Sequence, residues 1–200
     1  MNVLKKILVW VCWFRKRKGY GVHSPSAFYF IRSVVLETEL YYAYADLKPQ
    51  RKGVKGLDEK VDKLLFRLAN YVQPSTVVQV SGDYPLSLAY LQTGCQKAQC
   101  FSLNEEDPGQ LANVLDGRPL DLFHLPDVPN CQQWFLSAVE HAVEHSLFVV
   151  QGIHKDKQKK ELWKEMQEHP RVGRTYDLYE VGLIFFDHSK VKQHYKVNFV

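Results

Sequence analysis

The sequence predicts an α/β fold in which a mostly parallel sheet is covered by helices on both faces. Short runs rich in apolar residues and typical of buried strands, at 76–80, Leu120–Leu125 and 147–151, alternate with segments of helical periodicity. Such alternation implies right-handed crossovers between parallel strands. Two final extended segments, at 173–181 and 182–186, are joined tightly and predict a closing antiparallel hairpin at one edge.

Length and composition narrow the class of protein. The 200 residues suffice for one α/β domain, which we place at 57–200, after an N-terminal helical extension and basic linker at 1–56. The net charge of +4 is too small to indicate a specific nucleic-acid binder. The four cysteines form no C-x-x-C pair and follow no secretory signal, which predicts a reduced, cytoplasmic protein. No segment reaches the ~20 apolar residues of a membrane span.

The extension begins with an apolar segment from Val3 to Phe14, which leads into the basic run Arg15-Lys16-Arg17-Lys18. We predict a helix that ends in a solvated, charged turn. Two roles stay open for the piece from Val3 to Lys18. It docks on the domain, or it contacts a membrane surface or a second copy of the chain in a homo-oligomer.

A second helix is predicted to begin at Ser24 and Pro25. Ser24 serves as the N-cap, and Pro25 takes the first helical position, where a missing N–H costs nothing. Phe28, Ile31 and Val35 then supply an apolar stripe. We expect this helix to pack on the domain and to cover the approach to the turn after the first strand.

The first strand–turn–helix unit holds the predicted ligand site. Its strand at 76–80 leads through Gly82 and Asp83 into a helix at 84–92. A helix N-terminus that faces the carboxyl end of a parallel strand is where α/β sheets bind anionic or nucleotide ligands. Gly82 is the single glycine of this turn, and few glycines limit how closely a backbone approaches a ligand.

The other elements follow from apolar periodicity and from the prolines that end helices. They are helix 57–72, strand 98–103, strand Leu120–Leu125, helix 132–145, strand 147–151, helix 156–169, the hairpin and a last extended piece at 195–199.

One short motif suggests a different chemistry. The run His141-Ala142-Val143-Glu144-His145 matches the H-x-x-E-H pattern of inverted zinc peptidases. Histidines four residues apart on a helix share a face and can hold Zn²⁺. No second motif supplies a third ligand, and the predicted fold already explains this helix as a cover for the sheet. We therefore interpret both histidines as surface residues.

Three short segments of the sequence resemble segments of a known family. They are Gly21-Val22-His23-Ser24-Pro25, then Ile153-His154 before a helix that contains Trp163, and finally YDLYEVGLIFF at 176–186. With the order of elements, they resemble class I S-adenosylmethionine-dependent methyltransferases, and more closely the bacterial O-methyltransferase-like proteins. The resemblance implies a three-layer Rossmann-like methyltransferase fold, S-adenosylmethionine as cofactor and a small-molecule substrate.

The resemblance also implies where the functional residues lie. By this resemblance, His154 is the best candidate in this chain for a general base. The positions that would line the cofactor pocket are Gly82, Asp83, Asn104, Glu105 and Asp127.

The chain departs from the family pattern where the cofactor would bind. Asn104 stands where the family has a carboxylate that bonds the ribose hydroxyls. Only 105–119 separates the second strand from the third, which is too short for a crossover unit of about 30 residues. We therefore expect six strands, with the edge strand beyond 98–103 missing, and weak or absent binding of S-adenosylmethionine. Metal-using relatives have aspartates where this chain has Pro126 and Gln151, so no metal is expected.

Two functions remain. The first is a degenerate methyltransferase-like protein that acts as a binding or scaffolding module. The second is an active methyltransferase, similar to O-methyltransferases, with a remodelled cofactor pocket. Because one fold hosts many functions, the resemblance alone does not choose between them.

Overall fold

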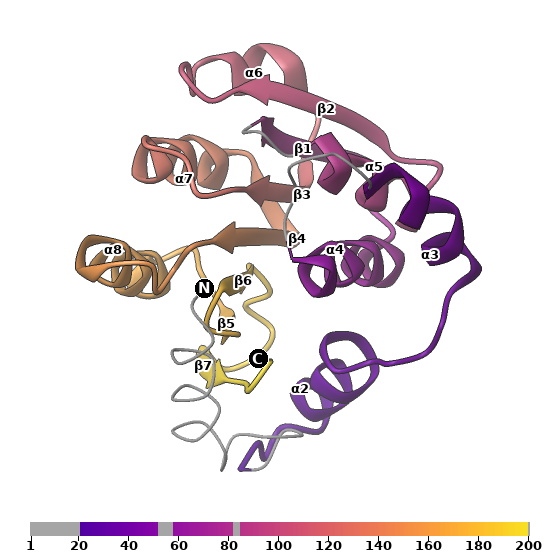
Figure 1. Ribbon diagram of the computed structural model, residues 1–200. Coiled ribbons are helices and arrows are strands. Elements are labelled where there is room, and N and C mark those ends of the chain that lie inside the picture. Colours follow the sequence, from indigo (N-terminus) through magenta and orange to yellow (C-terminus); the bar gives the residue numbers. More distant parts are fainter. Residues whose placement is uncertain (1–20, 52–57, 82–84, 200) are drawn as a thin grey trace.

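The computed structural model describes residues 21–51, 58–81 and 85–199. It is a three-layer α/β fold with a central sheet (Figure 1). The strands are β1 Thr76–Ser81, β2 Gln99–Asn104, β3 Leu120–Leu125, β4 Ala142–Gln151, β5 Arg174–Asp177, β6 Val181–Phe185 and β7 Gln193–Lys196. The helices are α2 Pro25–Phe30, η2 Ile31–Val35, α3 Tyr42–Leu47, η3 Lys48–Arg51, α4 Glu59–Val72, α5 Pro85–Gly94, α6 Gln110–Leu115, α7 Cys131–Glu140 and α8 Lys157–Glu168.

The sheet has the order β2-β1-β3-β4-β6-β5-β7. Only β6 runs against its neighbours, and it pairs antiparallel with both β4 and β5. The mostly parallel sheet and the closing hairpin are therefore confirmed. The missing edge strand is confirmed as well, because 105–119 contain only the short helix α6 and leave β2 at the edge. The expected total of six strands was wrong, because Gln193–Lys196 forms a strand that pairs in parallel with β5.

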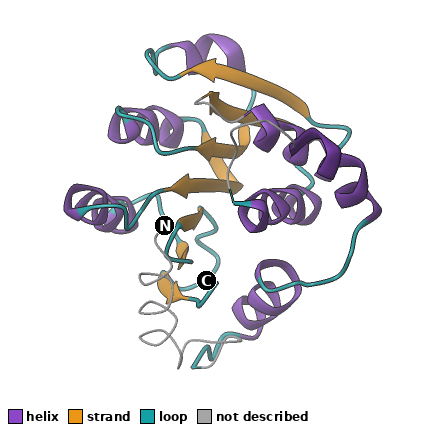
Figure 2. Ribbon diagram, viewed as in Figure 1, coloured by secondary structure: helices purple, strands orange, loops and turns teal. Residues whose placement is uncertain are grey.

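Helices cover both faces of the sheet (Figures 1 and 2). α4 and α5 lie on one face, and α6, α7 and α8 lie on the other. Because side chains alternate along a strand, Val77 packs in the core beneath α4, whereas its neighbour Val78 packs in the core beneath α7. The two cores are separate apolar layers. The burial of Val61, Leu64 and Leu68 confirms the predicted inner face of α4.

The helix predicted at Ser24 is present, and the Ser24 hydroxyl accepts a hydrogen bond from the N–H of Ala27 at 3.4 Å. Ile31 and Val35 are fully buried, as expected. Phe28 is 44 % exposed, so its place in the apolar stripe was wrong. The buried stripe runs instead through Ala27, Ile31 and Val35, and a residue one position after Ala27 points about 100° away from it.

This N-terminal helix packs on the domain through α4. Its continuation, the π-helical turn η2, leaves the carbonyl groups of Val34 and Val35 without helical partners. The buried guanidinium of Arg67 on α4 donates to both carbonyls, at 2.7 and 3.1 Å. The segment predicted to be covered by this helix, 82–84, lies outside the described residues. The neighbouring helix α5 is contacted by α3, which lies beside it in Figure 1.

The predicted helix at 132–145 was wrong in its second half. α7 ends at Glu140, and β4 begins at Ala142. The chain turns here because the Ser146 hydroxyl donates to the carbonyl of Leu120 at 2.7 Å and accepts from the N–H of Val143 at 2.7 Å. These bonds tie the start of β4 to β3.

The zinc-peptidase pattern is excluded by the same boundary. His141 caps α7, whereas His145 lies in β4 and bonds Asp121 at 2.9 Å, so the two histidines share no helix face.

Gly182 in β6 allows a close approach by the ring of Trp163, which is 97 % buried. A Cβ atom at position 182 would lie 2.5 Å from that ring. We expect Gly182→Ala to lower the free energy of unfolding by about 1–3 kcal/mol through overpacking, as measured by denaturant titration. Adding Trp163→Leu should recover part of that loss. If Gly182→Ala is as stable as the wild type, the ring does not constrain this position.

No helix in the described part of the chain has the length and apolar character needed to cross a bilayer. The piece from Val3 to Lys18 lies outside that part.

Candidate functional site

The predicted site residues that the structure describes lie along one edge of the sheet. Asn104 ends β2 and Glu105 follows it, Asp127 follows β3, and His154 follows β4. Since these strands are parallel, their carboxyl ends meet at that edge. Asn104 and His154 are nonetheless three strand intervals apart, or roughly 14 Å. They cannot act on the same atom of a small ligand.

Gly82 and Asp83, which were predicted to form the turn between β1 and α5, lie outside the described residues.

Asp127 is held by two lysines from the start of α8 and the loop before it. Its carboxylate lies 2.5 Å from Nζ of Lys155 and 2.9 Å from Nζ of Lys159. Burial raises the pKa of Asp127, but the hydrogen bonds from the two lysines outweigh it and leave that pKa below its ordinary value. Gly152 makes room for this carboxylate, because a Cβ there would lie 3.1 Å from Asp127 Cγ. Asp127 is thus paired within the chain.

The end of β2 offers an amide rather than a carboxylate. Asn104 is exposed, and its Oδ1 accepts a hydrogen bond from the N–H of Glu106 at 3.3 Å. The backbone carbonyl of Glu105 accepts from Nε1 of Trp134 at 3.0 Å, which fixes the loop against α7. This end of the sheet is thus held by hydrogen bonds within the chain.

His154 has the surroundings of an oriented imidazole. Its Nε2 lies 2.8 Å from Oδ2 of Asp177 at the end of β5, and its ring stacks on that of Tyr179 at 5.0 Å. The side chain is 17 % exposed. A carboxylate beside an imidazole holds the ring in one orientation, as a general base requires.

A chain of three buried polar side chains crosses the central strands just below this edge. His124 on β3 lies between Gln79 on β1 and Gln151 on β4. The His124 Nδ1–H donates to Oε1 of Gln79 at 3.0 Å, and Nε2 of His124 accepts from the Gln151 amide at 2.6 Å. Burial lowers the pKa of His124 to about 3, so this imidazole is neutral at physiological pH. These three side chains lie on the face of the sheet that α4 and α5 cover.

A second polar cluster joins α4 to α5. Asp62 is fully buried, forms an ion pair with Arg51 and accepts a hydrogen bond from the Ser87 hydroxyl at 3.0 Å. Burial raises the pKa of Asp62 above its ordinary value, although Arg51 and Ser87 act in the opposite direction. Because Ser87 lies in the first turn of α5, this cluster anchors the beginning of that helix.

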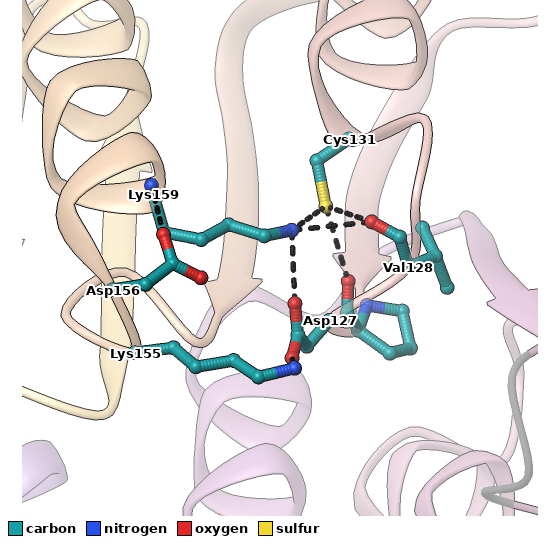
Figure 3. A network of polar contacts seen from close by, with 7 residues as sticks. Asp127, Val128, Cys131, Lys155, Asp156 and Lys159 are labelled. Atoms are coloured by element: carbon teal, nitrogen blue, oxygen red, sulfur yellow. Dashed lines mark hydrogen bonds and ion pairs between the residues drawn. The ribbon is translucent and has the colours of Figure 1, made fainter.

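A groove of about 520 Å³ lies between the beginnings of α7 and α8. Its walls are mostly polar, with Gln132 and Gln133 from α7 and Glu161 and Glu165 from α8. Figure 3 shows the network at its floor, where Lys159 reaches Asp127, the Val128 carbonyl and the sulfur of Cys131. The crevice that usually binds ligands in such sheets would lie between β1 and β3, whose following helices cover opposite faces. The groove is therefore beside that crevice and not in it.

Within the described ranges, no three histidine, cysteine, aspartate or glutamate side chains gather as a set that could hold a metal ion.

Sequence reasoning placed the strand ends correctly but missed the partners that the side chains take. The roles of His124, Asp177 and Lys159 were not predicted. A histidine within the apolar run of Leu120–Leu125 was a signal, because a buried imidazole requires hydrogen-bond partners on neighbouring strands. No local signal pairs Lys159 with Asp127, since this contact depends on how α8 docks.

Comparison with solved structures identifies the fold. The chain superposes on a methyltransferase from Geobacter sulfurreducens with a TM-score of 0.52 and 14 % identity, over 76 % of this chain and 92 % of that one. It superposes on PaMTH1, a methyltransferase of Podospora anserina solved with SAH bound, with a TM-score of 0.58 and 8 % identity, over 82 % and 96 % of the two chains. The strand order and the antiparallel β6 are those of the class I methyltransferase fold. At these identities the likeness concerns the fold alone.

No family model matches the sequence, and no curated protein matches it.

Proposed function

We propose that this protein is a degenerate member of the methyltransferase fold that acts as a binding or scaffolding module. The observation that carries the proposal is the internal pairing of Asp127. This carboxylate stands at a strand end where the fold can hold a ligand, and two lysine ammonium groups already occupy its oxygens. A ligand hydroxyl would have to compete with these charge-assisted hydrogen bonds, which are among the strongest in proteins.

Two further features support this function. The end of β2 presents the Asn104 amide, which lacks the charge of a carboxylate and so makes a weaker bond to a ribose hydroxyl. Among the residues that the structure describes, no strand lies beyond β2 to form a wall on that side of a nucleoside pocket. A ligand bound there would remain in contact with water on one side, and its base would bury less apolar surface.

The second candidate is an active methyltransferase on a small molecule, and the pairing of His154 with Asp177 favours it. In that role His154 would take a proton from a substrate hydroxyl, and Asp177 would hold the imidazole and stabilise the charge that it gains. The bound S-adenosylmethionine would supply the methyl group. Asn104, Glu105 and Asp127 follow the carboxyl ends of the strands and would contact that cofactor. Asp127 would do so as a residue that is already paired with Lys155 and Lys159.

Isothermal titration with S-adenosylmethionine and with its demethylated product separates the two candidates. We expect no dissociation constant tighter than about 1 mM, which corresponds to a binding free energy weaker than about 4 kcal/mol. The matched variant is Asn104→Asp, an exposed change that restores a carboxylate without touching the core. Micromolar binding by the wild-type chain would overturn the degenerate function and establish a cofactor pocket.

A further inference from the structure

The most unusual contact outside the strand ends joins a thiol to an amine. Sγ of Cys131, the first residue of α7, lies 2.9 Å from Nζ of Lys159 on α8 (Figure 3). The amine is fixed there by Asp127 at 2.9 Å and by the Val128 carbonyl at 3.1 Å. The sulfur is fixed as well, because its S–H donates to the same carbonyl at 2.8 Å. Nitrogen and sulfur are therefore held in contact by their surroundings.

We propose that Cys131 and Lys159 form a reversible covalent S–N bridge, a sulfenamide, when the protein meets a hydroperoxide. The Cys131 sulfur attacks one peroxide oxygen, the O–O bond breaks, and sulfenic acid forms together with water from hydrogen peroxide or an alcohol from an organic hydroperoxide. Lys159 gives one proton to solvent, and the lone pair of the resulting neutral Nζ attacks Sγ. The S–O bond breaks, the hydroxide takes the second proton from nitrogen, and it leaves as water. The sulfur has lost two electrons, and the peroxide has gained them.

The surroundings favour this product over further oxidation. Cys131 is only 2 % exposed, but Val128 and Lys159, which contact its sulfur, line the groove of about 520 Å³. A peroxide molecule in the groove would therefore be separated from the thiol only by residues that contact the sulfur directly. The ammonium group of Lys159 donates to the sulfur at 2.9 Å, so nitrogen and sulfur are already in contact before oxidation. The nitrogen of Lys159 is already in contact and can attack the sulfenic acid once it has lost a proton.

The described chain supplies an internal comparison in Cys100. It is more exposed than Cys131, yet burial raises the pKa of its thiol to about 11, and its sulfur donates to the Ala98 carbonyl rather than contacting an amine. Exposure alone predicts oxidation at Cys100. Contact with an amine predicts the bridge at Cys131.

The test is peptide mapping of the full chain before and after treatment with hydrogen peroxide, under non-reducing conditions. We expect a cross-linked pair of peptides that contain Cys131 and Lys159, lighter than their sum by two hydrogen atoms and separated again by a thiol reductant. Lys159→Arg keeps the positive charge but removes the amine. In that variant we expect no cross-link, and a sulfenic acid at Cys131 that a 1,3-diketone reagent labels.

Circular dichroism confirms that each variant is folded before it is treated, and Cys131→Ser serves as a second negative control. Two results would overturn the proposal. One is a reduced Cys131 in wild-type protein whose Cys100 has been oxidised. The other is a wild-type Cys131 that becomes sulfinic acid with no link to Lys159.

Discussion

The free energy of unfolding should fall by about 2 kcal/mol when the pH is lowered from about 6.5 to about 5, because of His124 alone. Burial lowers the pKa of His124 in the folded chain to about 3, whereas an exposed histidine in the unfolded chain titrates near 6.5. At pH values between these two pKa values, His124 is protonated in the unfolded state and neutral in the folded state. The stabilisation is complete above the unfolded pKa and is lost as the pH falls toward the folded pKa.

Urea titrations at several pH values check this expectation. The stability of the wild type should change by about 1.4 kcal/mol for each pH unit in this range, in addition to the changes from other groups. His124→Gln should lower the stability at neutral pH and remove that part of the slope. Burial also lowers the pKa of His169 and His194, which therefore add to the pH dependence of both proteins. The effect of His124 is the difference between the slope of the wild type and that of His124→Gln. Equal slopes for the two proteins would show that His124 is protonated in the folded chain.

Arg67→Met should cost about 3 kcal/mol of stability and should loosen 21–51 from the domain. Methionine fills a similar volume but donates no hydrogen bond. The carbonyls of Val34 and Val35, which accept from Arg67, would then be buried with no donor from α4. Leaving such groups unsatisfied costs about 1–3 kcal/mol each.

Denaturant titration measures the loss, and limited proteolysis reports whether cleavage within 21–51 becomes faster. Arg32→Met is the matched control, because Arg32 lies on the same π-helical turn but is exposed. Arg67→Lys separates charge from geometry, since lysine keeps the charge but cannot reach both carbonyls with one rigid fork. An Arg67→Met chain as stable as the Arg32→Met chain would contradict the anchoring role.

Much of the fold was predictable because its signals are local. The uncharged run at 76–80 and the periodicity of α4 each identify an element without reference to the rest of the chain. The missing edge strand was also predictable, because chain length between β2 and β3 sets an upper limit on what can form there. The boundary between α7 and β4 was not, since it depends on bonds between Ser146 and the distant residue Leu120.

The sequence predicts where the candidate site residues lie, but not whether their side chains are available to a ligand. A strand end can be found from sequence, and Asp127 and His154 both lie at the expected edge. Whether such a side chain is available to a ligand depends on its partners in space. Lys159 and Asp177, which pair with these two residues, come from parts of the chain 32 and 23 residues away, and no local pattern relates them.

The three buried side chains that cross the sheet also restrict how its strands can align. Gln79 and His124 are direct partners in the register of β1 and β3. If β3 slid by one residue, an apolar side chain would replace the imidazole at that position, and His124 would point to the opposite face. The imidazole would lose both amides inside an apolar layer, at a cost of several kcal/mol. Because β3 is buried on both faces, its apolar side chains alone distinguish the two alignments only weakly, and the three polar side chains favour the observed register.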